Sequence, residues 1–244
     1  MINPKFVFAR YNEDVSWIYK YPKIANNAII YNKGNKLKLD PNFDTKIIEL
    51  SNDPSYGREG DTHLTHIIKN YDHLDDYTIF SQMNPFDHSP EFIEIVLYMM
   101  ENQIFKSFQP LTLGWKIKEG VPPLENILYD TSEYINRYKL YMEIVNTKLD
   151  PINYKDRGII PAINEFKKFN QIVTDNILPH IYNILNIKKP YCGYIKFNYG
   201  GIFGVSKQNI LQNNLAFYTH LQKFIRENWS HGYIIERIWY TIFS

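Results

Sequence analysis

The stretch GREGDTHLTHIIKNYDHLDDYTIFS, residues 57–81, places a helix pattern directly before a strand pattern. Apolar residues recur there at helical spacing, at Leu64, Ile67, Ile68 and Tyr71. Asp61 stands where it can cap this helix, and the run YTIFS at 77–81 is short, apolar and β-prone. A helix that leads into a buried strand through a short connection is typical of a parallel sheet with helices on its faces.

Three earlier runs repeat the strand pattern, namely KFVFA (5–9), AIIYN (28–32) and KIIEL (46–50). We therefore predict an α/β fold with a mostly parallel central sheet flanked by helices, in one domain spanning residues 1–244. Further along, the patterns predict a helix from Ser89-Pro90-Glu91 to about 108, helices at 131–147 and 161–187, a strand pair formed by 193–198 and 202–205, and a helix from Ser206 to about 228.

Residues 109–130 lose all periodicity and contain three Pro and two Gly. A long irregular segment inside a compact domain is often functional, so we expect a lid or acceptor loop there.

Composition limits the partners and the compartment. The 27 basic and 26 acidic residues give a net charge of +1, which argues against nonspecific electrostatic binding of nucleic acid. The longest apolar run, IVLYMM at 95–100, is too short to span a membrane. The chain has one cysteine, Cys192, and the residues around Lys5 and Arg10 do not show the pattern of a signal peptide. These two features predict a cytoplasmic protein.

Several common catalytic motifs do not occur in the chain. It has no GxxxxGK[ST] phosphate loop, no GxGxxG after a strand, no GxSxG nucleophile elbow and no HExxH zinc motif. These absences remove many enzyme classes without selecting one.

Candidate ligand-binding residues follow the predicted strands, because ligands of open α/β sheets bind beyond the carboxyl ends of the strands. After the first strand, Arg10 can bind phosphate and Tyr11 can stack on a ring, although Asp14 there equally fits a helix start. Asn32 and Lys33 follow the second strand in a composition that also makes ordinary turns.

Polar groups also precede the helix near residue 60 and follow the fourth predicted strand. Arg58 lies where a helix N-terminus would attract an anion. Gln82, Asp87 and His88 offer amide, carboxylate and imidazole groups for a sugar or for Mn²⁺ or Mg²⁺, or they belong to a turn that prepares the next helix.

Glu236 stands in the apolar run YIIERIW. A carboxylate in apolar surroundings can have a raised pKa and act as a general base, or it can be one half of a structural ion pair. Both interpretations of Glu236 stay open at this point.

The runs VFARYNEDVSWI, IIYNKG, GREGDTHLTHIIKNYDHLDDYTIFSQ, GGIFGVSK and ERIWYTIF resemble, in that order, a family of fungal, plant and large-virus proteins. That family looks like a relative of glycosyltransferases with the GT-A fold. The resemblance covers most of 5–90 and 191–243, and it implies a single GT-A-like, Rossmann-like domain.

The resemblance further implies transfer of a sugar from a nucleotide-sugar donor, with UDP favoured, to a hydroxyl of a glycan or glycoprotein. Arg10, Tyr11, Asp14, Asn32 and Lys33 would then hold the nucleotide, with Arg58 near the phosphates. Where relatives carry a metal-binding Asp-x-Asp, this chain has Ser81-Gln82-Met83.

Without Asp-x-Asp, a divalent cation would need other ligands, for which Asp87, His88 and His231 are the candidates, or cationic side chains would neutralise the diphosphate instead. If the transfer inverts the anomeric centre, Glu236 is the candidate base. The alternative is a non-catalytic nucleotide- or carbohydrate-binding protein of the same fold.

Overall fold

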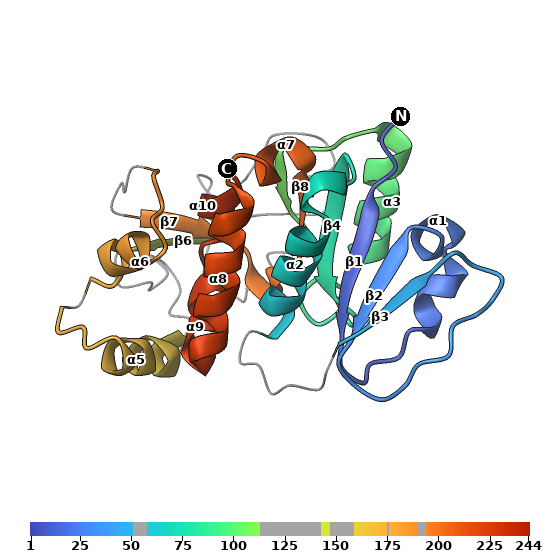
Figure 1. The fold of residues 1–244 in the computed structure, drawn as a ribbon. Helices are drawn as coiled ribbons and strands as arrows, with labels where there is room; N and C mark the ends of the chain where they lie inside the picture. Colours follow the sequence, from blue (N-terminus) through green and yellow to red (C-terminus); the bar gives the residue numbers. More distant parts are fainter. Residues whose placement is uncertain (51–57, 113–142, 147–158, 175, 190–193) are drawn as a thin grey trace, which may run out of the picture.

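The structure is a computed structural model that describes residues 1–50, 58–112, 143–146, 159–174, 176–189 and 194–244. It is an α/β fold with a six-stranded mixed sheet flanked by helices, as predicted (Figure 1). The strand order is β3-β2-β1-β4-β8-β5. These strands are β1 (Lys5–Arg10), β2 (Ala28–Asn32), β3 (Lys46–Glu49), β4 (Tyr77–Gln82), β5 (Phe108–Pro110) and β8 (Phe203–Ser206).

Strands β1 to β4 run parallel to one another, and β8 runs antiparallel between β4 and β5. The register pairs Phe8 with Ile30 on one side and with Ser81 on the other. Because β1 has helices on both faces, its sequence is apolar almost throughout, as expected of a strand buried on both faces.

Helices cover the two faces of the sheet, and each face has its own apolar core (Figure 1). Phe6 and Phe8 point to the face that carries η1 (Ser16–Lys20), α1 (Pro22–Ala25) and α3 (Phe92–Asn102). Val7 and Phe80 point to the face that carries α2 (Arg58–Lys69), α8 (Leu215–Glu227), α9 (Trp229–Glu236) and α10 (Trp239–Phe243). Each fully buried Phe contributes about 1.5–3 kcal/mol to stability.

The remaining described elements lie around this framework. They are η2 (Tyr71–His73), β6 (Glu143–Asn146), α5 (Ile159–Phe169), α6 (Leu178–Ile184), β7 (Tyr194–Phe197), η4 (Tyr199–Gly201) and α7 (Lys207–Ile210). No helix in the described ranges combines the length and the apolar character that crossing a bilayer requires.

Several predicted elements differ from the structure. The predicted strand pair 193–198 with 202–205 is wrong, because β7 pairs with β6, whereas β8 pairs with β4 and β5. Residues 143–146, expected in a helix, form β6, and residues 161–187 divide into α5 and α6. Pro179 lies in the first turn of α6, where its missing N–H is tolerated.

The bounds of two predicted helices, those beginning near Ser89 and at Ser206, also differ from the structure. The Ser89 hydroxyl donates to the carbonyl of Leu111 at 2.5 Å instead of capping α3, and α3 ends at Asn102 because Gln103 adopts a left-handed conformation. Ser206 does cap a helix, accepting from the Asn209 N–H, but that helix is the short α7, and Asn214 caps α8 separately.

Parts of the predictions lie outside the described residues, namely 113–130 of the expected lid, 131–142 of an expected helix, and Cys192. Residues 109 and 110 of the expected lid belong to β5.

Candidate active site

Polar groups from six elements converge at the carboxyl edge of the parallel strands. Arg10, Asn32 and Gln82 are the last residues of β1, β2 and β4. Helix α2 begins on this side, and the pairing of Phe80 with Phe203 brings η4 to it, since β8 runs antiparallel. The end of α9 joins through Glu236, which contacts Gly200. This is the edge at which open α/β sheets bind ligands.

Arg10 and Asn32 hold the loops that follow β1 and β2. The buried Arg10 guanidinium donates to Asn32 Oδ1 at 2.6 Å and to the carbonyls of Glu13 and Asn35 at 2.9 and 3.1 Å. Asn32 Nδ2 donates to Glu49 Oε2 at 2.8 Å. Both predicted nucleotide-binding side chains are therefore engaged inside the protein, where they shape the edge of the sheet.

Gly34 lets these two loops touch. A Cβ on Gly34 would lie 1.3 Å from the carbonyl oxygen of Tyr11, so no other residue fits without moving the backbone. The Asn35 N–H also donates to Asn12 Oδ1 at 3.0 Å. The loop that sequence reasoning reads as either a ligand loop or a turn is thus fastened to its neighbour.

Tyr11, Asp14 and Gln82 occupy different positions at this edge. Tyr11 is 56% exposed, which leaves its ring free to stack on a planar group. Asp14 accepts from the Ser16 N–H and hydroxyl at the start of η1, and these bonds lower its pKa, which fits the helix-start interpretation. Gln82 Nε2 donates to the Asn84 carbonyl at 2.7 Å.

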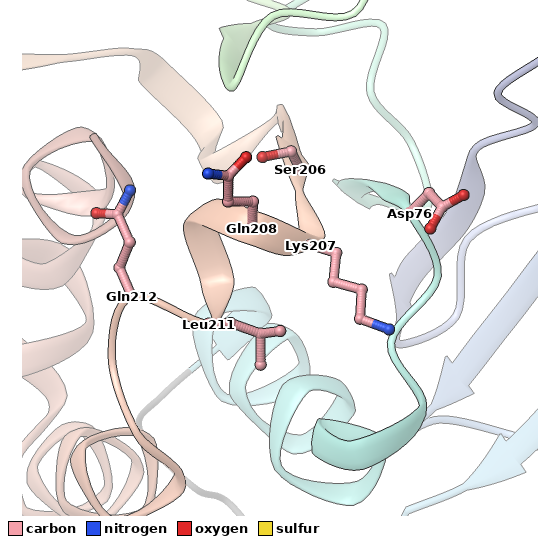
Figure 2. Close-up of a pocket in the computed structure, with 6 residues that line it drawn as sticks. All are labelled: Asp76, Ser206, Lys207, Gln208, Leu211 and Gln212. Atoms are coloured by element: carbon pink, nitrogen blue, oxygen red, sulfur yellow. The ribbon is translucent and has the colours of Figure 1, made fainter.

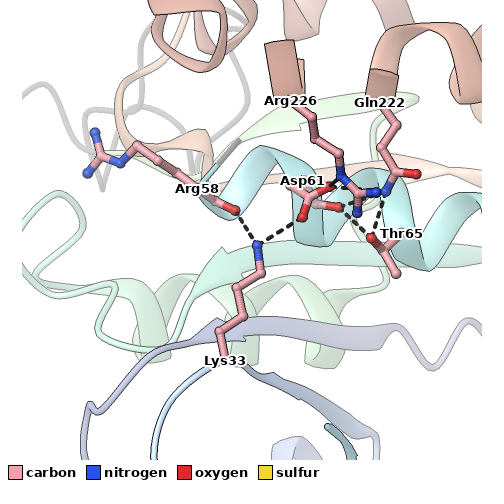
Figure 3. Close-up of polar contacts among 6 residues, drawn as sticks. All are labelled: Lys33, Arg58, Asp61, Thr65, Gln222 and Arg226. Atoms are coloured by element: carbon pink, nitrogen blue, oxygen red, sulfur yellow. Dashed lines mark hydrogen bonds and ion pairs between the residues drawn. The ribbon is translucent and has the colours of Figure 1, made fainter. Parts of the chain in front are cut away.

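Lys33 binds α2 through a cluster of charges (Figure 3). Lys33 Nζ lies 3.0 Å from Asp61 Oδ2, and Arg226 Nε lies 2.6 Å from Asp61 Oδ1. Burial raises the pKa of Asp61, but the hydrogen bond from Arg226 and the charge of Lys33 outweigh it, so the pKa is lowered overall. The expectation that Asp61 caps α2 is wrong: the side chain joins α2 to the β2 loop and to α8.

Arg58 begins α2 and presents a cation at the helix N-terminus, as predicted. Its side chain is 52% exposed, and its guanidinium lies 4.9 Å from the centre of the Tyr233 ring. The residue has φ of 50°, a conformation that only a few per cent of non-glycine residues adopt. An exposed cation beside a helix N-terminus is suited to bind an anion.

Glu236, the predicted base, is fixed by two contacts. Its Oε1 accepts from the N–H of Gly200 at 2.9 Å, and its Oε2 pairs with Arg237 Nη1 at 3.1 Å. The side chain is 13% exposed. Glu236 therefore reaches the candidate site, and it forms the structural ion pair that was the alternative interpretation.

Glu59 is a second carboxylate at the same place, and sequence reasoning did not select it. Burial raises the pKa of Glu59, and the nearby charge of Glu236 raises it further, against the opposing charges of Arg58 and Lys33. When two carboxylates interact in this way, the charge of one raises the pKa of the other.

A glycine turn lies between the two carboxylates. Gly200 and Gly201 have φ of 71° and 58°, which glycine adopts without strain. A Cβ at Gly200 would lie 2.9 Å from His88 Cδ2, so the imidazole of His88 packs directly on the turn. The carbonyl of Gly201 contacts His63 Nε2 at 3.0 Å.

His63 and His66 are both buried on α2. Burial lowers the pKa of His63 to about 3 and that of His66 to about 4, so both rings are neutral. His66 Nδ1 contacts the hydroxyl of Tyr31 at 3.1 Å, whereas His63 faces the glycine turn.

The residues predicted as metal ligands do not assemble. His231 Nδ1 bonds to the Phe224 carbonyl at 2.7 Å, and its Nε2 contacts Asn170 Nδ2 at 3.3 Å, so both ring nitrogens are engaged. Asp87 is exposed and lies 3.4 Å from Asn84 Nδ2. Across the ranges that the structure describes, no three His, Cys, Asp or Glu side chains are arranged to hold a metal ion. The predicted ligand set therefore does not fit a divalent cation.

An open groove of about 620 Å³ lies at the opposite, amino edge of the parallel strands (Figure 2). It is lined by Asp76, Ser206, Lys207, Gln208, Leu211 and Gln212. None of the predicted ligand-binding, catalytic or metal-binding residues lines this groove, so it is separate from the candidate site.

Sequence reasoning missed Glu59 and the link between His63 and Gly201. The sequence carries no signal for Glu59, because an acidic residue in the first turn of a helix is common. The contact between His63 and the turn joins distant parts of the chain, and no local pattern announces it.

Comparison with known proteins adds one finding. No curated protein matches the chain, and no solved structure does. Residues 6–107 match the model of a family described as a protein of unknown function, DUF3431. The match spans β1 to β4 with Arg10, Asn32 and Glu59, and it stops before the glycine turn and Glu236.

Proposed function

We propose that the protein is a glycosyltransferase that moves a sugar from a nucleotide-sugar donor, with UDP favoured, to a hydroxyl of a glycan or glycoprotein acceptor. The observation that carries the proposal is the pair Glu59 and Glu236, one with a raised pKa, beside the cation Arg58 at the carboxyl edge of the sheet. Departure of a diphosphate requires a cation to meet its negative charge, and an inverting transfer requires a carboxylate to take the proton of the acceptor hydroxyl.

The parts of the donor have matching partners along this edge. The exposed ring of Tyr11 can stack on the base, and Arg58 with the N-terminus of α2 can neutralise the diphosphate. Since the described residues do not form a cation site, the proposal routes no step through a metal. The cytoplasm, predicted from the sequence, is the compartment we propose.

The proposal is tested by thermal-shift measurements with UDP-, GDP-, ADP- and CMP-sugars, each with and without Mn²⁺, followed by assays of donor consumption with acceptor sugars. Stabilisation by one donor class and its consumption are expected. The absence of a shift with all four classes would refute donor binding.

Arg58 provides a matched pair of variants, because Lys69 is an exposed cation at the other end of the same helix. Arg58→Ala should weaken donor binding by about tenfold or more, as loss of a charge-assisted contact to phosphate does. Lys69→Ala should leave donor binding unchanged. Equal affinities for the two variants would remove Arg58 from the donor site.

The alternative function, a non-catalytic nucleotide- or carbohydrate-binding protein, is favoured by one observation. Both carboxylate oxygens of Glu236 are engaged within the protein, to Gly200 and to Arg237. Donor binding without donor consumption, with every acceptor tried, would support this alternative.

A further inference from the structure

Two carboxylates reach the Gly200–Gly201 turn from different helices, and the protein holds them in different ways. Glu236, from α9, is committed through Oε1 to the Gly200 N–H at 2.9 Å and through Oε2 to Arg237 at 3.1 Å. Glu59, from α2, pairs only loosely with Arg58, at 3.7 Å, and its side chain keeps 15% of its surface exposed. Of the two, Glu59 is the carboxylate that no short ion pair holds.

We propose that Glu59, and not Glu236, is the catalytic base of the transfer, and that Glu236 and His63 are positioning residues that hold the glycine turn beside it. This inference rests on the proposed function. In the step, the acceptor oxygen bonds to the anomeric carbon, and the bond from that carbon to the diphosphate oxygen breaks with its electron pair leaving on the diphosphate. The proton of the acceptor hydroxyl passes to the carboxylate of Glu59.

The turn is fastened at both of its residues. Glu236 accepts from the N–H of Gly200, and the carbonyl of Gly201 lies 3.0 Å from His63 Nε2. Because a carbonyl can only accept and the His63 ring is neutral, Nε2 carries the proton and donates it. His63 thereby fixes the turn and takes no part in proton transfer.

The turn also lies directly against Glu59. A Cβ on Gly201 would be 3.4 Å from Glu59 Cγ and 3.9 Å from Glu59 Oε1, so the bare backbone of Gly201 packs directly against the Glu59 side chain.

The charges around Glu59 favour a base and not a permanently ionised carboxylate. The surrounding titratable groups are Arg58 and His63 of α2, Lys33 after β2, His88 against the turn, and Tyr233, Glu236 and Arg237 of the α9 region. Burial and Glu236 raise the pKa of Glu59 more than Arg58 and Lys33 lower it. A carboxylate whose pKa moves toward neutrality is a more effective base at neutral pH.

The test compares Glu59→Gln, Glu236→Gln and His63→Gln in the pH dependence of kcat, with His66→Gln as the matched control. His66 is also buried on α2 but contacts Tyr31 and not the turn. Glu59→Gln should lower kcat by about 10²–10⁴-fold and abolish the rise of kcat with pH, with donor KM nearly unchanged.

The positioning residues should behave differently from the base. Glu236→Gln should keep the rise of kcat but move it to lower pH, because it removes the charge that raises the pKa of Glu59. His63→Gln should lower kcat without moving the pH profile, and His66→Gln should change neither. Glu59→Asp keeps a carboxylate and should retain the rise at reduced kcat, which covers the case in which Glu59→Gln does not fold.

Two results separate this inference from the proposed function. If the wild-type protein consumes no donor, the proposed function fails and the role of Glu59 with it. If the wild-type protein transfers sugar, and Glu59→Gln keeps its rate and pH profile or Glu236→Gln alone abolishes the rise, the inference fails and the function stands. Carboxyl ¹³C NMR of the ligand-free protein adds a check: one glutamate should have a pKa above its ordinary value of 4.5, and this titration should be absent in Glu59→Gln and move to lower pH in Glu236→Gln.

Discussion

Replacing Asp61 by Asn removes the negative charge between Lys33 and Arg226 while keeping the shape of the side chain (Figure 3). The Asn oxygen can still accept from Arg226, but the amide nitrogen then faces the ammonium of Lys33, donor against donor. Gln222, which donates to Asp61 Oδ1 at 3.1 Å, keeps its second bond to Thr65. The variant thus isolates the charge from the packing.

The magnitude follows from the two ion pairs. Loss of the part-buried Lys33 contact costs about 1.5–2 kcal/mol, the lower part of the range of about 1.5–3 kcal/mol for hydrogen bonds to charged groups. The Arg226 side chain is 47% exposed, so solvent screening limits its share to about 0.5–1 kcal/mol. Together the free energy of unfolding should fall by about 2–3 kcal/mol, which for a chain of this size lowers Tm by roughly 5–10 °C.

The assay is urea unfolding at pH 7 and at acidic pH, followed by circular dichroism, with Asp72→Asn on the exposed η2 segment as the control. The pKa of Asp61 is lower in the folded protein than its ordinary value of 3.8. Its stabilising effect is therefore present above the unfolded pKa and lost as pH falls through the folded pKa. The gap between wild type and Asp61→Asn should close in that window. A gap below 0.5 kcal/mol at neutral pH, or one that persists in acid, would refute the reasoning.

Three further outcomes are expected. Gly34→Ala should unfold at markedly lower urea concentration than wild type, because its Cβ would lie 1.3 Å from the Tyr11 carbonyl oxygen. The control Gly60→Ala, whose Cβ would lie 3.3 Å from its nearest neighbour, should differ little from wild type. Similar unfolding midpoints for the two variants would contradict the contact between the loops. Between pH 7 and pH 5, the buried His66 of pKa about 4 stays neutral in the folded protein but gains a proton in the unfolded chain, so acidification lowers the stability. His66→Gln removes this effect, and its free energy of unfolding, measured with urea, should fall less over that pH range than that of the wild type. Arg58→Lys should keep the charge at the start of α2 but lose the bidentate contact to phosphate. Its donor affinity, measured by calorimetry, should therefore lie between those of the wild type and Arg58→Ala. An affinity below that of Arg58→Ala would argue against a role for the charge.

The parallel half of the sheet could be predicted from the sequence because its signals are local. KFVFA, AIIYN, KIIEL and YTIFS are short apolar runs bounded by polar segments, and each forms a strand within a residue or two of the expected bounds. Helix α2 was predictable for the same reason, since its apolar residues recur at helical spacing.

The rest depends on contacts between distant parts of the chain. A strand pair was predicted from two adjacent runs, 193–198 and 202–205. In the structure β8 lies between β4 and β5 and pairs with both, so the predicted pair does not form. Arg10 was expected to face a ligand, and it turns inward because carbonyls of two loops surround its guanidinium. The pKa of Glu59 is raised by its burial and then by the charge of Glu236, which α9 brings beside α2 from a distant part of the chain.

The position of β8 has a consequence for the order in which the sheet assembles. β5 is the last strand of the order and pairs only with β8 in the described sheet, although it comes long before β8 in the chain. β5 therefore has no strand to join until residues 203–206 have docked on β4, and the intervening chain must close as one long loop. Strands β1 to β4 have no such dependence. We expect refolding kinetics with an early phase for residues 5–82 and a later phase in which β8 and β5 add together, because strand pairing across long sequence separations is slow.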